Sequence, residues 1–287
     1  MEKQQRGAVI ELIIAMCLSG TIGWFVTESR QPVWNVVFAR CVVGSLGLAA
    51  YISLTGLWRA WHFNARSLLW CIAGGLALVA NWLLLFNAYL YSSIGLATVV
   101  YHTQPFWLLL LGVLLLGEKL TRQKLLALAL AFAGLLLIVL PDTHMALKNW
   151  QLGSLLALGA AILYAVTTII TKQLPKDLPP HLIALVQTLV GAVLLFPMLD
   201  SGSALQIGNH WYYLAILGLV HTTGMYILMY AAFRKLPTHL IGVIGFIYPV
   251  VAMLVDYVAY GRVLGWLQLA GMVLIIGSNA FVLNRAK

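Results

Sequence analysis

The 287-residue chain is too apolar for a water-soluble globule, because 62% of its residues are hydrophobic, only 9% are charged, and its mean hydropathy is +0.94. Soluble domains contain about 25% charged residues, so we expect a membrane protein. The net charge of +9 does not indicate nucleic-acid binding, since the lysines and arginines lie in short connectors and form no basic face. Cys17, Cys41 and Cys71 are far apart in apolar stretches, so they predict neither a metal site nor a disulfide framework.

The first twenty residues are a charged stub followed by an apolar run. Glu11 interrupts this run and no small-residue cleavage site follows, so we expect a spanning helix that the mature protein keeps. A spanning helix needs about 20 mostly apolar residues. The chain contains ten such segments, at about 8–26, 33–54, 67–90, 94–116, 123–140, 151–171, 181–199, 211–233, 238–260 and 265–283.

The charges in the connectors predict the orientation. If the N-terminus is cytoplasmic, thirteen basic residues fall on the inner side and three on the outer side. The inner set is Lys3, Arg6, Arg59, Arg66, Lys119, Arg122, Lys124, Lys172, Lys176, Arg234, Lys235, Arg285 and Lys287, and the outer set is Arg30, Lys148 and Arg262. Because positive charge accumulates on the cytoplasmic side, we expect both termini there.

The second half of the chain repeats the first at a shift of 144 residues. Gly74 aligns with Gly218, Pro105 with Pro249 and Gly117 with Gly261. Each half, 1–143 and 144–287, carries five segments, and an odd number gives the two halves opposite orientations in the membrane. We therefore predict an all-α polytopic membrane protein whose ten transmembrane helices form a 5+5 inverted-topology repeat. Many secondary transporters have such an architecture, with their site at the midplane between the halves.

Several stretches resemble the EamA type of the drug/metabolite transporter superfamily, and the resemblance covers nearly the whole chain. LLLLGVLLLGEKLT (108–121) is similar to the family's fourth helix, which ends in a Gly-Glu pair at the cytoplasm, and Gly134 lies in a similar fifth helix. Arg40, in VVFARCVVGSL, matches an arginine common in the second helix. Ser19-Gly20 and Gly261-Arg262 depart from the family's pattern. The resemblance implies a central cavity surrounded by helices one to four and six to nine, with helices five and ten at the periphery.

The stretch VVYHTQPFW (99–107) interrupts an apolar run with polar residues. Thr98, Tyr101 and His102 fall on one helical stripe, flanked by Gln104, and a polar stripe at this depth must face other helices or water. Tyr101, His102 and Gln104 therefore fit substrate contacts, while hydrogen bonds between helices are the alternative. His102 also fits a proton carrier, because imidazole titrates near neutral pH.

Pro105 and Pro249 each remove a backbone donor and predict a bend in their helices, which serves either as a gate hinge or as a static kink. Arg40 is charged and lies inside a predicted span. Three roles fit it: binding a substrate carboxylate, pairing with Asp256, or reaching outward to the headgroups.

Acidic residues in or near the spans are candidates for coupling and gating. Glu11 and Asp256 fit either proton exchange or structural pairing, Glu11 with a nearby base and Asp256 with Arg40 or Arg262. Glu118 lies in a basic turn, where it fits a solvated loop or a latch to Arg234 or Lys235. The other candidate substrate contacts are polar or aromatic residues that fit helix packing as well: Asn81, Trp82, Tyr164, His221, Tyr226, Phe246 and Tyr248.

No phosphate-binding loop, metal motif or nucleophile motif appears, so we expect neither ATP drive, nor cofactor or metal, nor an enzyme. The sequence predicts a secondary transporter of the bacterial inner membrane that alternates access around its midplane cavity. The family resemblance implies export of small metabolites such as amino acids. A multidrug or organic-cation exporter and, more remotely, a membrane enzyme acting on lipid-linked substrates are the alternatives. The expected partners are a small-molecule substrate, membrane lipid and, as a candidate, protons, and either a monomer or a homodimer fits.

Overall fold

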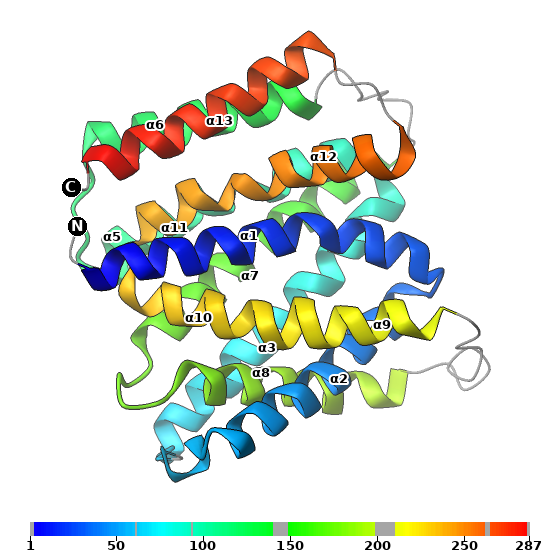
Figure 1. Cartoon of the computed structure of the whole chain (residues 1–287), viewed down its shortest axis with the longest axis vertical. Coiled ribbons are helices and arrows are strands. Elements are labelled where there is room, and N and C mark those ends of the chain that lie inside the picture. Colours follow the sequence, from blue (N-terminus) through cyan, green and yellow to red (C-terminus); the bar gives the residue numbers. More distant parts are fainter. Residues whose placement is uncertain are drawn as a thin grey trace.

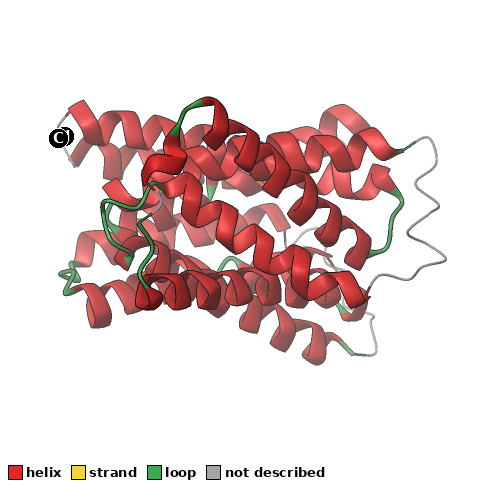
Figure 2. Ribbon diagram, turned by 90° about the horizontal axis from the view of Figure 1, so that it is seen from below, coloured by secondary structure: helices red, strands yellow, loops and turns green. Residues whose placement is uncertain are grey.

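The computed structural model describes residues 3–60, 62–92, 94–139, 149–198, 210–261 and 265–285. These residues form helices joined by turns, and no strand occurs among them (Figure 2). Ten helical stretches in this part of the chain are long and apolar enough to cross a membrane, at the positions that the sequence predicts. The protein is therefore a multi-pass membrane protein.

Most spans are single helices. They are α1 (Lys3–Ser29), α2 (Val33–Leu54), α3 (Ala65–Tyr91), α6 (Arg122–Val139), α7 (Trp150–Gln173), α8 (Pro180–Leu195) and α13 (Trp266–Arg285). The 3₁₀ turn η1 (Leu57–Ala60) lies between α2 and α3, and η3 (Phe196–Met198) follows α8.

Three spans that were predicted as single helices are interrupted. The fourth consists of α4 (Ile94–Tyr101) and α5 (Gln104–Leu116), and the ninth of α11 (Thr238–Gly245) and α12 (Ile247–Tyr260). The eighth consists of α9 (Trp211–Gly218), the π-helix η4 (Leu219–Gly224) and α10 (Met225–Lys235). Hydropathy does not detect these interruptions, because the interrupting residues are themselves compatible with a long apolar segment.

The helix ends follow from local sequence. Asn64 caps α3: its side chain accepts from the Ser67 backbone N–H at 2.7 Å, and the Ser67 hydroxyl accepts from the Asn64 backbone N–H at 3.0 Å. Gly117 and Gly261, which are 144 residues apart, end α5 and α12 with φ values of 65° and 64°. Only glycine adopts this left-handed conformation at little cost, so the two repeats end their fourth helices in the same way.

The connectors divide between two ends of the bundle. The connectors α2–α3, α5–α6, α7–α8 and α10–α11 lie at the end where α1 begins and α13 ends (Figure 1). We call this the terminal end and the opposite one the distal end. The predicted inner basic residues of these connectors therefore gather at one end, which agrees with the alternation that the charge pattern predicts.

Helices from the two halves pack against each other throughout. α3 packs on α7, α1 on α9 and α10, and α2 on α8 and η4. α6 and α13 form a peripheral pair at one end of the long axis (Figure 1). They cross where Gly134 meets Gly271, and a Cβ on either glycine would collide with the other's carbonyl oxygen. This close approach fixes the crossing point of the pair.

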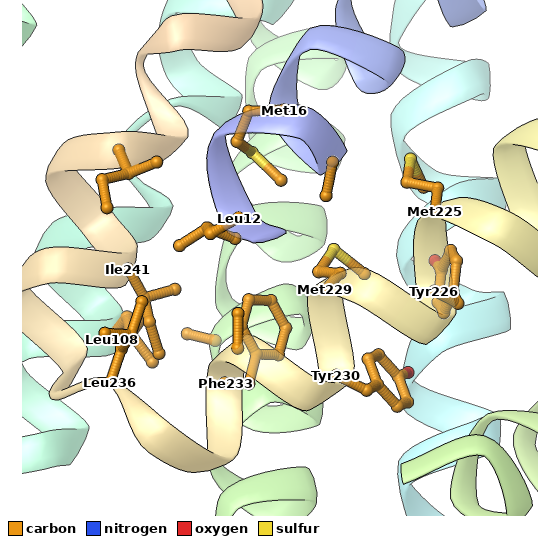
Figure 3. Close-up of a cluster of buried hydrophobic side chains, with 14 of the residues drawn as sticks. Leu12, Met16, Leu108, Met225, Tyr226, Met229, Tyr230, Phe233, Leu236 and Ile241 are labelled. Carbon is orange, nitrogen blue, oxygen red and sulfur yellow. The ribbon is translucent and has the colours of Figure 1, made fainter. Parts of the chain in front are cut away.

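Apolar side chains fill the space between α1, α5, α10 and α11 near the terminal end (Figure 3). Leu12 and Met16 come from α1, and Met229 and Phe233 come from α10. All four are at most 6% exposed. This packing leaves the polar candidate residues next to the apolar cluster, on its distal side, where Ser19 and Tyr101 keep part of their accessible surface.

Candidate functional site

Arg40 belongs to α2, and its side chain lies inside the protein against α3 and the π-helix η4. Its side chain is 2% exposed. Nε donates to Thr222 Oγ1 at 3.4 Å, Nη2 donates to the His221 carbonyl oxygen at 3.5 Å, and the guanidinium stands 4.4 Å from the centre of the Trp82 ring. Arg40 therefore does not extend to the headgroups, which excludes one of its three predicted roles.

The charge of Arg40 is poorly compensated. Removing an ion of this size from water costs several kcal/mol, and a desolvated cation–π contact returns about 2 kcal/mol. The two hydrogen bonds, at 3.4 and 3.5 Å, are longer than the usual range of about 2.7–3.2 Å. Among the described side chains, the one ion pair is that between Lys235 and Glu11, so Arg40 has no acidic partner there. Asp256, its predicted partner, is in α12, and its side chain lies outside the described residues.

Aromatic side chains surround this guanidinium. The rings of Trp82 and Tyr226 meet edge to face at 6.1 Å, and those of Tyr101 and Tyr164 at 6.3 Å. Arg40 lies close enough to both Tyr101 and Tyr226 to interact with them electrostatically. The structure thus brings together, with Arg40, predicted site residues from five different spans.

Asn81 connects helix packing to this cluster. Its Nδ2 donates to the Ala160 carbonyl oxygen at 2.6 Å and more weakly to the Tyr101 hydroxyl at 3.4 Å. Its Oδ1 is buried and has no hydrogen-bond partner among the residues that the structure describes. Asn81 therefore holds α3 against α7, as one of its predicted roles requires, and still presents an unused acceptor.

Both predicted proline bends are present as breaks in the helix. Pro105 has no N–H to donate to the Tyr101 carbonyl, and α4 ends at that residue. His102 fills the break, with Nδ1 2.8 Å from the Thr98 carbonyl oxygen and its ring stacked on Tyr248 at 5.2 Å. Pro249 produces the equivalent break at Phe246, between α11 and α12.

Equivalent positions of the two halves meet at this site. Trp82 and Tyr226 are related by the 144-residue shift, and so are His102 and Phe246, whose rings lie 5.9 Å apart. Two residues related by a two-fold axis touch each other only where they lie next to that axis. The pseudo-two-fold axis of the inverted repeat therefore passes through the cluster.

The π-helix η4 of the eighth span has no equivalent in α3, the corresponding helix of the first repeat. Within η4, the Thr222 and Thr223 hydroxyls donate to carbonyl oxygens five residues earlier, at 2.9 and 3.2 Å. The His221 Nε2 lies 2.7 Å from Thr21 Oγ1 of α1. π-helical turns often occur at functional sites, and this one places the His221 carbonyl and Thr222 hydroxyl against Arg40.

Gln104, the remaining predicted contact of the fourth span, is 8% exposed, and its Oε1 has no partner. In the described part of the chain, no group of three His, Cys, Asp or Glu side chains has a geometry that suits a metal ion. An open groove of about 820 Å³ lies elsewhere, on the apolar surface of α6 and α13 beside Trp266.

Glu11 and Glu118 lie at the terminal end, away from the cluster. Glu11 pairs with Lys235 at 3.1 Å, as one of its predicted roles requires. The predicted latch from Glu118 to Arg234 or Lys235 is wrong for the described residues. Glu118 instead accepts from the Thr238 backbone N–H at 3.1 and 3.2 Å and from its hydroxyl at 2.7 Å, because the first turn of α11 has unpaired donors.

Comparison with known proteins identifies the fold family. The model of the EamA-like transporter family matches the chain twice, at residues 7–140 and 151–284. The chain belongs to the EamA-like transporter family. The two matches correspond to the two five-helix repeats, and membership makes the chain a transporter of the drug/metabolite superfamily.

Individual relatives agree with this assignment. An uncharacterized transporter, YxxF, of Bacillus subtilis strain 168 is 31% identical over 99% of this chain and 91% of its own length. A probable amino-acid metabolite efflux pump of Salmonella typhimurium strain LT2 is 27% identical over 63% of this chain and 64% of its own length. A protein of known crystal structure superposes with a TM-score of 0.82 over 97% of this chain at 17% identity, which shows a shared fold.

Sequence reasoning missed several side chains of this EamA-like transporter. Tyr230 donates a short hydrogen bond to Gln187 Oε1, and both residues are fully buried. Thr238 was not predicted as the partner of Glu118, which is 120 residues away. The equivalence of Trp82 and Tyr226 under the 144-residue shift was a usable signal, because an aromatic residue stands at that position in both halves.

Proposed function

We propose that this protein is a secondary active transporter of the bacterial inner membrane that exports small metabolites, such as amino acids, by alternating access between its two repeats. The observation that carries the proposal is the contact between equivalent positions, 82 with 226 and 102 with 246, on the pseudo-two-fold axis. Secondary transporters built from inverted repeats bind at this boundary. The proposed substrate contacts are Arg40, Asn81, Trp82, Tyr101, His102, Gln104, Tyr164, His221, Tyr226, Phe246 and Tyr248.

The proposed gate at the terminal end consists of the apolar cluster and the polar links beyond it. Glu118 joins the end of α5 to the start of α11, and Glu11 joins α1 to α10, so both links connect the first repeat to the second. Opening this end requires both links to separate. Pro105 and Pro249 are the proposed hinges, because each interrupts its helix next to the axis.

We propose that the terminal end faces the cytoplasm, since it carries the basic connectors. Cysteines introduced at Arg6 and Arg122 should then react with impermeant reagents only from the cytoplasmic side. Protons are a candidate coupling ion, with Glu11, Asp256 and His102 as candidate carriers, and facilitated diffusion is the alternative. The relative named as a probable efflux pump supports export.

The two alternative functions have less support. An organic-cation exporter needs an accessible acid at its centre, whereas the described part of the central cluster carries Arg40 and no acid. A membrane enzyme needs paired catalytic groups at one interface, and the relatives reported above are named as transporters.

Efflux from proteoliposomes tests the proposal. Purified protein should release at least one member of a panel of amino acids and other small metabolites faster than protein-free liposomes do, and two imposed pH gradients should reveal proton coupling. Tyr101→Phe should slow efflux several-fold, because it removes a hydroxyl beside Arg40. Tyr257→Phe, the same change at a tyrosine that is 51% exposed on α12, is the matched control and should leave efflux unchanged. Equal efflux from protein and empty liposomes across the panel would contradict the proposed function.

A further inference from the structure

We propose that the site between the repeats recognises the carboxylate of its substrate through Arg40 and excludes organic cations. This inference rests on the proposed function, since it names the substrate class of the same site. It comes from the balance of charges and hydrogen-bond donors around the guanidinium.

The charge of Arg40 is uncompensated among the described side chains. Arg40 is 2% exposed, and among the described side chains it is matched by two long hydrogen bonds and one aromatic ring, without an acid. A buried guanidinium with unused donors is a good receptor for a carboxylate, because its planar fork fits both carboxylate oxygens.

Two tyrosine hydroxyls in the cluster around Arg40 have no acceptor among the described residues. The Tyr101 hydroxyl accepts from Asn81 Nδ2, and its proton has no acceptor among the described residues. The Tyr164 hydroxyl, which lies close to Tyr101 and Tyr226, likewise donates to no described residue. A carboxylate supplies the acceptors that these donors lack, whereas an ammonium or a quaternary amine would add further donors or positive charge.

The fold does not need this charge. At the 144-residue shift Arg40 corresponds to Ala184, which is 0% exposed. When α2 and α8 are instead aligned at their N-cap residues, Pro32 and Pro179, Arg40 corresponds to Gln187, which is buried and accepts from Tyr230. Because the second repeat packs with a neutral residue in either alignment, the arginine of the first repeat serves something beyond packing.

The rest of the substrate has defined surroundings. Trp82 and Tyr226, each at most 7% exposed, offer apolar ring surface next to the cationic group, and the fully buried Phe246 offers more beside His102. The unpartnered Oδ1 of Asn81 is an acceptor for one donor of the substrate, such as an ammonium or a hydroxyl group. The substrate class is thus a small carboxylate with an apolar portion, with or without a neighbouring donor.

The first experiment measures the thermal unfolding of ligand-free protein in detergent. Arg40→Gln copies the second repeat and removes a charge without a described acidic partner, so its melting temperature should equal or exceed that of the wild type. Arg122→Gln, at an exposed arginine, is the matched control and should leave it unchanged. A structural ion pair with Asp256 predicts the opposite: Arg40→Gln and Asp256→Asn would each lower the melting temperature. That result would overturn the proposal.

The second experiment measures binding of matched ligand sets by ligand-induced thermal shift. Each set holds a carboxylic acid, its primary amide and the amine of the same carbon skeleton, as in 4-methylpentanoate, its amide and 3-methylbutylamine, together with leucine and leucinamide. Carboxylates should shift the wild type, and the amides and amines should bind about tenfold more weakly or not at all. Arg40→Lys, which keeps the charge but loses the fork, should weaken carboxylate binding by about tenfold, and Arg40→Gln should abolish it.

Both experiments work without a transport signal, so they separate the two proposals. Carboxylate binding by a protein that moves nothing would contradict the transport function and leave the carboxylate site intact. Amine binding that is equal in wild type and Arg40→Gln, or no carboxylate-dependent shift anywhere in the panel, would overturn the carboxylate site. Efflux of amines with no dependence on Arg40 would also overturn it and leave the transport function standing.

Discussion

Glu118 illustrates how one side chain joins the two repeats. It follows Gly117, whose left-handed conformation lets the Glu118 N–H donate back to the Gly112 carbonyl at 3.1 Å. Its carboxylate then supplies acceptors for the first turn of α11, in the other repeat. An acid at a helix N-terminus is stabilised by the unpaired N–H groups and by the helix dipole. Glu118 thus links α5 to α11 at the terminal end without an ion pair among the described residues.

Glu118→Ala should loosen this end. Loss of such a cap costs about 1 kcal/mol, which corresponds to roughly a fivefold shift towards the open terminal end. A cysteine replacing Leu236, which is 1% exposed in the connector before α11, reports the shift through its rate of thiol labelling. The measurement uses a background in which the part-exposed Cys17 is serine.

Glu11→Gln is the comparison for this measurement. The Glu11–Lys235 pair keeps about a third of each side chain exposed, at 29% and 33%, and exposed pairs contribute about 0–1 kcal/mol. Glu11→Gln should therefore increase the labelling rate of the cysteine at position 236 less than Glu118→Ala does. An unchanged rate in Glu118→Ala would show that this cap does not hold the gate.

At the scale of the helices, the sequence predicts the interruptions at Pro105 and Pro249 but not the contact between them. Pro105 and Pro249 predict the interruptions directly, because proline lacks the donor that the preceding turn needs. The contact between the two breaks, His102 on Phe246, depends on packing between segments 144 residues apart and has no local signal. The π-helix is likewise invisible in the sequence, since Thr223 is held there partly by a hydrogen bond to the Gly44 carbonyl of α2.

Pro105→Ala and Pro249→Ala distinguish a hinge from a static kink. Restoring the N–H allows a continuous helix, so a hinge role predicts a several-fold lower maximal efflux rate with little change in the substrate concentration at half-maximal rate. A kink that only shapes the site predicts the reverse: weaker apparent affinity at an unchanged maximal rate. Initial efflux rates over a range of internal substrate concentrations separate the two.

At the scale of the whole molecule, the ten spans, the inverted repeat and the position of Arg40 inside a span follow from hydropathy, charge and the 144-residue shift. Individual partners do not follow, because they depend on how distant helices dock. Arg40 is an example: its charge and depth are readable from the sequence, whereas its contacts with Trp82, Thr222 and the His221 carbonyl come from α3 and η4. Hydropathy gives each helix its position along the chain but not its neighbours.

The positive charge of Arg40, which has no acidic partner among the described residues, has a consequence for energetics. If the substrate is a monoanion, the empty site carries charge +1 and the loaded site is neutral. Across a membrane that is negative inside, each charge that crosses the whole field is worth about 2.3 kcal/mol per 100 mV. The membrane voltage therefore favours the step in which the empty, positively charged site returns to the cytoplasmic side. The voltage does not oppose the outward step of the loaded, neutral site, so export of a monoanion needs no proton.

Efflux from liposomes clamped with valinomycin and potassium tests this consequence. An inside-negative voltage should accelerate release of a monoanion several-fold and leave release of a zwitterion nearly unchanged, because the zwitterion leaves the loaded site as positive as the empty one. Equal voltage dependence for both substrates would contradict a net charge of +1 in the empty site. For a monoanion, a single arginine that has a neutral counterpart in the other repeat would thus favour export by coupling the return of the empty carrier to the resting potential.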